Sequence, residues 1–116
     1  MRRDEMLNQL CKDTHENAKS KGWWEQEKSF GELIALVHSE LSEALEEYRN
    51  GNAPNEIVYL KGIGGDKPEG IPIELADVLI RIVDLCGRYG IDLDEAVRIK
   101  MEYNKKRTWR HGGKKC

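Results

Sequence analysis

Apolar side chains recur at intervals of three and four residues along four stretches of the chain. This spacing places them on one face of an α-helix, so the pattern predicts four amphipathic helices. The predicted helices cover residues 4–20, 29–50, 72 to about 87–90, and 92 onward.

Start and stop signals agree with these limits. Ser29 and the acid three residues after it have the spacing of a capping box, and Gly51 ends the same run. Pro72 suits the first turn of a helix, where its missing N–H would have no partner. Asp92 is a favoured N-cap residue, with Glu95 three residues on. The predicted boundaries therefore rest on capping chemistry as well as on periodicity.

The segment between the second and third helices, residues 52–71, has no helical pattern and is rich in glycine. Within it, Glu56–Lys61 could form a short strand or an extended edge. A connection this long in a compact domain is usually functional or partly disordered. The sequence leaves its role open.

These elements predict an all-α fold, a single domain over residues 1–116 built as a four-helix bundle. A chain of this length buries roughly two thirds of the surface of its unfolded state. Apolar stripes on all four helices exceed what a lone bundle needs to bury. We therefore expect homo-oligomerisation, to a homodimer or a homotetramer, to complete the fold.

The net charge and the apolar content exclude two classes of partner. The formal net charge is −2, from 19 basic and 21 acidic residues, whereas a nucleic-acid-binding domain carries a strong basic excess. No apolar run approaches the roughly 18 residues of a membrane span. We expect no nucleic-acid and no membrane partner.

Three cysteines, Cys11, Cys86 and Cys116, form an odd set without a CxxC pair. This favours reduced, structural thiols over a disulfide framework. The N-terminal residues also lack the apolar core of a signal peptide. A cytoplasmic location is the expectation.

The charges are segregated along the chain. The span 32–47 carries five glutamates and no Lys or Arg, while eight basic residues and one acid follow from Arg98. An acidic helix and a basic end in one small domain suggest a site that binds both cations and anions.

Two carboxylate pairs carry the clearest chemical signal: Glu40-x-x-Glu43 and Glu74-x-x-Asp77. Three-residue spacing puts both members of a pair on one helical face. If the two helices pack antiparallel, the pairs face each other and offer several oxygens to a hard cation. Oxygen ligands suit Mg²⁺, with Mn²⁺ as an alternative.

Two other readings of these pairs stay open from spacing alone. Glutamate favours helices, so each pair could lie on a solvated face. Glu74 and Asp77, however, are nearly the only acids in an otherwise apolar helix, with Asp84 two turns further along. Burying them is costly without compensation. A di-iron bundle needs Glu-x-x-His pairs, and no histidine here stands three residues after a glutamate.

The local sequences HSELSEALEEYR and IELADVLIRIVDL resemble the all-α nucleotide pyrophosphatases related to MazG, dimeric dUTPase and dCTP pyrophosphatase. The resemblance extends from about His15 to Lys114. It implies a MazG-like bundle that hydrolyses a nucleoside triphosphate between its α and β phosphates, with Mg²⁺, to a monophosphate and pyrophosphate. It also implies that the metal ligands are Glu40, Glu43, Glu74 and Asp77.

The chain departs from this family at two points. Many relatives have an acid before the first motif glutamate, where this chain has Ser39. The general base is therefore unassigned, and Glu43 or Glu47 is predicted to orient the attacking water. The spacer between Glu43 and Glu74 is also long, because it includes residues 52–71.

The resemblance further implies residues for the substrate. The base-binding candidates are His15 and Trp24, although Trp24 could equally be a core or interface anchor. The phosphate-binding candidates lie at the end of the fourth helix, where basic residues would also be favoured by the helix macrodipole. These are Lys100, Asn104, Lys106, Arg107 and Arg110.

A different class of function is consistent with the same residues. The chain could be a non-catalytic, helical nucleotide-binding or assembly protein that kept the fold. Metal-dependent turnover would separate the two functions. The preferred base and sugar are not readable from the sequence.

Overall fold

The computed structural model of the protein describes residues 2–62 and 64–107. It contains four α-helices, a 3-10 turn at Arg3–Glu5 and one small antiparallel hairpin. The helices are α1 (Met6–Ser20), α2 (Phe30–Arg49), α3 (Ile71–Tyr89) and α4 (Leu93–Lys106), and the strands are β1 (Val58–Leu60) and β2 (Lys67–Glu69). The predicted all-α fold class is confirmed.

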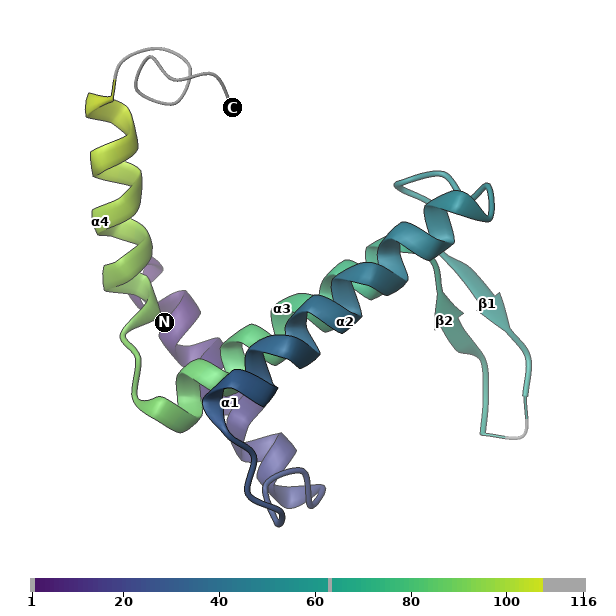
Figure 1. Cartoon of the computed structure of the whole chain (residues 1–116), viewed down its shortest axis with the longest axis horizontal. Helices are drawn as coiled ribbons and strands as arrows, with labels where there is room; N and C mark the ends of the chain where they lie inside the picture. The colour runs from purple at the N-terminus through teal and green to yellow at the C-terminus, as the bar shows by residue number, and fades with distance from the viewer. Residues whose placement is uncertain (1, 63, 108–116) are drawn as a thin grey trace.

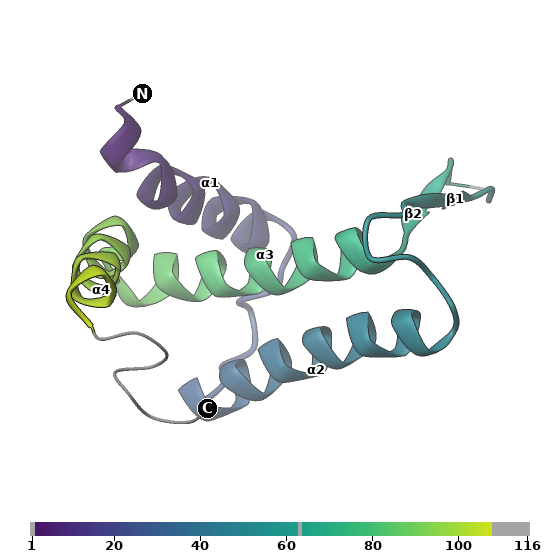
Figure 2. The same cartoon turned by 90° about the horizontal axis from the view of Figure 1, so that it is seen from above.

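Helix α3 is the centre of the arrangement. It packs against α1 on one side and against α2 on the other, and α2 and α3 run antiparallel (Figures 1 and 2). The hairpin extends from the end of the molecule where α3 begins, and α4 stands at the opposite end (Figure 1). Helix α4 packs against α1.

The core where these helices meet is small. Val83 of α3 is fully buried, and Cys11 of α1 packs beside Cys86 of α3. Burial raises the pKa of the Cys11 thiol to about 11, so this sulfur stays protonated at neutral pH. This agrees with the structural role predicted for the two cysteines.

The predicted caps are present. Ser29 Oγ accepts from the Glu32 N–H at 3.1 Å, and Asp92 Oδ1 accepts from the Glu95 N–H at 3.1 Å. Helix α3 does not end at Gly87, the earlier of the two predicted limits. It continues to Tyr89 and ends at Gly90, whose φ of 63° is left-handed and suits glycine.

Helices α1 and α4 cap each other. The Asp94 carboxylate accepts from the Leu7 and Asn8 N–H groups at 3.2 and 2.8 Å. In return, Asn8 Oδ1 accepts from the Leu93 N–H at 2.9 Å. Each side chain thus satisfies N–H groups that the first turn of a helix leaves without a partner, and the pair fixes where α4 starts.

The sequence left open whether residues 56–61 form a strand or an extended edge. They contain strand β1, in which Val58 lies opposite Glu69 of β2. Gly70 joins β2 to α3 with a φ of 122°, and a Cβ there would lie 2.4 Å from the Glu56 carbonyl oxygen. Only glycine fits this joint. The joint therefore fixes the base of the hairpin against the start of α3.

Gly87 allows the closest approach of α1 to α3. A Cβ at this position would lie 2.7 Å from both the Cys11 carbonyl oxygen and His15 Cβ. Neither neighbour is the free end of a flexible side chain. The absent methyl group is therefore what lets the two helices come together here.

We expect Gly87→Ala to lower the free energy of unfolding by about 1–3 kcal/mol, because the added methyl forces α1 away from α3. The matched control is Gly31→Ala in α2, where the new Cβ has only Ser29 Oγ nearby, at 3.9 Å. That change should be neutral or stabilising by up to about 1 kcal/mol. Urea denaturation of both variants measures the difference, and equal effects would contradict the packing argument.

Candidate metal centre

The antiparallel packing of α2 and α3 brings the two carboxylate pairs together. Glu40, Glu74 and Asp77 each offer an oxygen within 4.8 Å of the others. Glu43 lies one turn after Glu40 and is within hydrogen-bonding reach of Glu74. The four acids predicted as metal ligands thus meet on facing helices.

Glu74 is the most constrained of these acids. It is 7% exposed, and its Oε2 atom is buried without a hydrogen-bond partner among the described residues. Burial, followed by the nearby Glu43 carboxylate, raises the pKa of Glu74 to about 7. Asp77 and Glu40 act in the same direction. A buried acceptor oxygen without a donor lacks the compensation that burial normally requires.

The donor set fits a divalent hard cation. All the converging ligand atoms are carboxylate oxygens, which Mg²⁺ and Mn²⁺ accept, and a cation would give Glu74 Oε2 the partner that it lacks. Asp77 shows the same strain, since burial and the Glu40 charge raise its pKa.

A second group of acids shares Glu74. Glu47, Glu69 and Glu74 also offer oxygens within 4.8 Å of one another. Asn52 donates a hydrogen bond to Glu47, and Lys67 Nζ lies 3.0 Å from Glu69 Oε1. Glu69 was not among the residues predicted from the sequence. The signal for it was an acid one residue before the glycine that precedes the third helix.

Arg81 is a second residue that was not predicted from the sequence. It follows Asp77 by one turn of α3, and its Nε donates to Glu40 Oε1 at 2.8 Å. Its guanidinium carbon lies 4.5 Å from the centroid of the Trp23 ring. Its charge lowers the pKa of Asp77, in opposition to burial. Arg81 is thus a cation built into the edge of the acidic cluster.

A cleft of about 300 Å³ opens beside the acids. This volume lies at the lower end of the range for small-molecule sites. Side chains from α2, from α3 and from the end of α1 with the segment after it line the cleft. They include Lys21, Trp23, Glu40, Asp77, Arg81 and Asp84.

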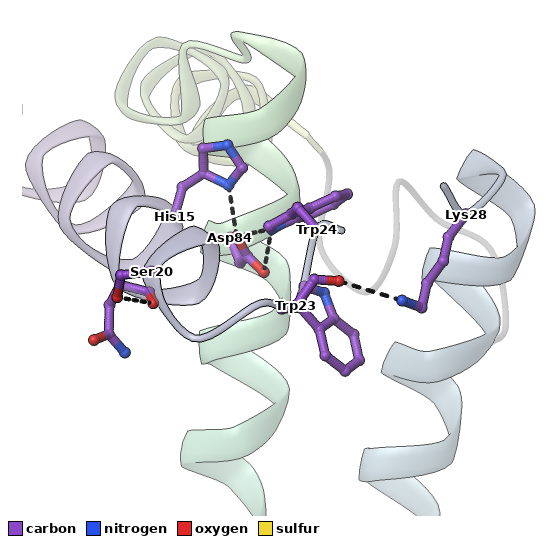
Figure 3. Close-up of polar contacts among 7 residues, drawn as sticks. His15, Ser20, Trp23, Trp24, Lys28 and Asp84 are labelled. Carbon is purple, nitrogen blue, oxygen red and sulfur yellow. Dashed lines mark hydrogen bonds and ion pairs between the residues drawn. The ribbon is translucent and has the colours of Figure 1, made fainter. Parts of the chain in front are cut away.

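His15 and Trp24, the predicted base-binding residues, both contact Asp84 of α3 (Figure 3). His15 Nδ1 lies 2.8 Å from Asp84 Oδ1, and the Trp24 indole N–H donates to both Asp84 oxygens, at 2.9 and 3.2 Å. The His15 and Trp24 rings meet edge to face. His15 and Asp84 are buried and Trp24 is half-buried. This network joins α1 and the following segment to α3.

The predicted phosphate-binding residues are not brought to the acids within one chain. Lys100, Asn104 and Lys106 are exposed on α4, and Arg107 follows its end half-buried. Helix α4 stands at the opposite end of the molecule from the hairpin (Figure 1). Glu74, in the first turn of α3, is grouped with Glu69 of the hairpin, so the acids lie toward the hairpin end. Arg110 lies outside the described residues.

Comparison with known proteins gives one partial match. A dATP/dGTP diphosphohydrolase of Cyanophage S-2L is 47% identical over 38 residues. The match spans about a third of each protein, 33% of this chain and 36% of the relative. No protein-family model and no solved structure matches the chain. The match fits a nucleotide pyrophosphohydrolase family.

Among the described residues, none of the helices has both the length and the apolar character that a membrane span requires.

The raised pKa of Glu74 gives the metal-free protein a distinctive pH dependence. The folded state retains a proton up to about pH 7 that the unfolded chain loses near its ordinary value of 4.5. The free energy of unfolding should therefore fall as the pH rises from about 4.5 to 7. Mg²⁺ should restore stability at pH 8 and have little effect at pH 5. Thermal midpoints with EDTA and with Mg²⁺ measure both effects.

Glu74→Gln is the control for this prediction, because it keeps the shape of the side chain and removes its titration. The variant should show a flatter pH dependence and a smaller effect of Mg²⁺. A metal-free protein whose stability rises between pH 5 and pH 8 would contradict the assignment.

Proposed function

We propose that the protein is a Mg²⁺-dependent nucleoside triphosphate pyrophosphohydrolase, which cleaves the bond between the α and β phosphates. The observation that carries the proposal is the buried Glu74 Oε2, which has no hydrogen-bond partner among the described residues and lies inside a cluster of carboxylates on α2 and α3. The partial match to a dATP/dGTP diphosphohydrolase supports purine deoxynucleoside triphosphates as the substrate class. A role in clearing unwanted nucleotides is consistent with this chemistry.

Glu40, Glu43, Glu74 and Asp77 would hold the metal. When bound, Mg²⁺ supplies charge stabilisation for the phosphates and lowers the pKa of a coordinated water. Glu47 is better placed than Glu43 to orient the attacking water, because its carboxylate is half-buried and Asn52 holds it. This order of preference refines the two candidates from the sequence.

Arg81 would neutralise the phosphates. In the structure its Nε pairs with Glu40, which is itself a candidate ligand. If Glu40 held a cation, the Arg81 guanidinium could instead face a phosphate, because Arg can bind two phosphate oxygens at once. Lys21, which lines the same cleft, adds a second positive charge.

With Mg²⁺ or Mn²⁺ the protein should release pyrophosphate from at least one nucleoside triphosphate. Glu74→Gln should lower this turnover at least 100-fold, because it removes the charge shared by both acidic groups. The matched control is Glu46→Gln, an exposed glutamate of α2, which should leave turnover unchanged. Enzyme-coupled detection of pyrophosphate measures all three proteins.

Release of orthophosphate in place of pyrophosphate would contradict the bond assignment. Binding of nucleotide without turnover, across a panel of canonical and modified triphosphates, would favour the alternative of a non-catalytic nucleotide-binding or assembly protein.

We also propose that the active form is a homodimer or homotetramer. Large apolar side chains remain exposed on α4, among them Ile99 at 54% and Met101 at 58%. Others remain exposed on α2, including Leu41 and Leu45. A second copy would cover such faces and could also bring the basic end of α4 to the acids, which one chain alone does not do.

Sedimentation at micromolar concentration should therefore show a dimer or a tetramer, because the exposed apolar area of the monomer favours association. A monomer that retains full turnover would overturn the proposal.

A further inference from the structure

Four polar side chains form a continuous stripe along α3: Glu74, Asp77, Arg81 and Asp84. Their spacing of three, four and three residues places them on one face of the helix. None of the four is exposed, and both ends of the stripe are buried. The metal cluster accounts for the first two, and Arg81 pairs with Glu40. Asp84 at the far end has no part in the chemistry described so far.

The distance between Asp84 and the acids proposed to hold the metal would let Asp84 contact the base of a nucleotide whose phosphates lie at those acids. Asp84 lies seven positions after Asp77, which corresponds to a rise of about 10 Å along the helix. A nucleotide whose phosphates lie at Asp77 has its base roughly that far away. Both aspartates line the same cleft.

The hydrogen bonds of Asp84 leave acceptor capacity on one oxygen. Oδ1 contacts His15 Nδ1 at 2.8 Å and accepts the Trp24 indole N–H at 2.9 Å. Among the described residues, Oδ2 has only the longer arm of the Trp24 bond, at 3.2 Å. A carboxylate oxygen can accept two hydrogen bonds. Oδ2 is therefore a fixed, under-used acceptor on a residue that lines the cleft (Figure 3).

The wall of the cleft near Asp84 suits a flat ring. The half-buried indole of Trp23 lines it, and the guanidinium of Arg81 lies against that indole. Aromatic and guanidinium planes are the surfaces on which nucleobases commonly stack. The cleft thus combines a stacking surface with a carboxylate acceptor at the end away from the metal ligands.

We propose that this cleft receives the nucleobase and that Asp84 Oδ2 accepts an N–H hydrogen bond from it, which selects bases with a guanine-type edge. Guanine offers an imino N–H and an amino group side by side, and both can donate to a carboxylate. Adenine and thymine place an acceptor atom beside their N–H donor, and that atom faces the carboxylate unfavourably. The inference rests on the proposed function for the position of the phosphates.

On this proposal His15 and Trp24 act as positioning residues, because their donors hold the Asp84 carboxylate in one orientation. His15 and Trp24 would therefore contribute to base recognition indirectly, through Asp84, and not by contacting the base themselves. It also explains why a charged residue lies in the small core at the α1–α3 contact, where burial is otherwise costly.

The test compares dGTP with dITP, whose base differs only by the absence of the amino group. The wild-type protein with Mg²⁺ should have a KM for dGTP about 10- to 100-fold lower than for dITP, since a hydrogen bond to a charged group has that effect. Asp84→Asn should reduce this ratio to within about threefold. Its amide still accepts from Trp24, so its NH₂ group faces the cleft and repels the amino group of guanine.

Asp13→Asn is the matched control, because it neutralises an exposed carboxylate of α1 that does not line the cleft, and it should leave the dGTP preference unchanged. Trp24→Phe removes one of the donors that hold the Asp84 carboxylate, so it should weaken the dGTP preference even though the carboxylate remains. A purely structural Asp84 predicts instead that Asp84→Asn and Trp24→Phe lower the thermal midpoint and leave the ratio unchanged.

The wild-type protein alone can overturn the inference, whether or not the variants fold. Pyrophosphate release without discrimination between dGTP and dITP would reject the role of Asp84 and leave the proposed function standing. Calorimetric titration of the protein with the same two nucleotides and Mg²⁺ tests the converse case, in which the base site exists but the proposed reaction does not occur. Selective binding of dGTP without turnover would support the base site and reject the proposed reaction.

Discussion

The rest of the structure is organised around the burial of charge along α3. This helix forms the core with α1 and α2, and yet one of its faces carries the carboxylates of Glu74, Asp77 and Asp84. A buried carboxylate needs hydrogen-bond donors or a cation. At the Asp84 end, His15 and Trp24 supply donors. At the Glu74 end, nothing among the described residues does so.

The two ends of the stripe are therefore compensated to different degrees. The donors of His15 and Trp24 let Asp84 hold α1 to α3 in the absence of a ligand, while its Oδ2 keeps the acceptor capacity that the proposed base contact uses. Glu74 is surrounded by like charges that burial keeps close together, and the metal-free fold tolerates this by raising the pKa of Glu74 to about 7. Arg81 offsets part of the charge through Glu40. The fold therefore holds these carboxylates in a strained arrangement, which a divalent ion at the proposed site would relieve.

Periodicity and caps were enough to predict the helices, because the side chains of Ser29 and Asp92 accept hydrogen bonds from N–H groups only three residues further along the chain. The three-residue spacing of the carboxylate pairs was also enough to predict that Glu40, Glu74 and Asp77 lie together. This prediction required only that α2 and α3 pack antiparallel. Glu69 could not be placed in this way, because its position depends on the hairpin and on the Gly70 joint. Asp84 was noticed as a lone acid, but its partners His15 and Trp24 come from sixty or more positions away.

The spacing of the polar residues along α3 does not by itself reveal which group each of these side chains contacts. A helix that repeats polar residues every three and four positions on its inner face cannot bury that face against apolar partners alone. Each polar side chain must instead meet a specific group: facing acids for Glu74 and Asp77, Glu40 for Arg81, and two ring donors for Asp84. These partners come from α1, α2, the segment between them and strand β2. The order of polar residues along one helix thus sets the order of the two proposed sites, with the proposed metal ligands at one end and the proposed base contact at the other.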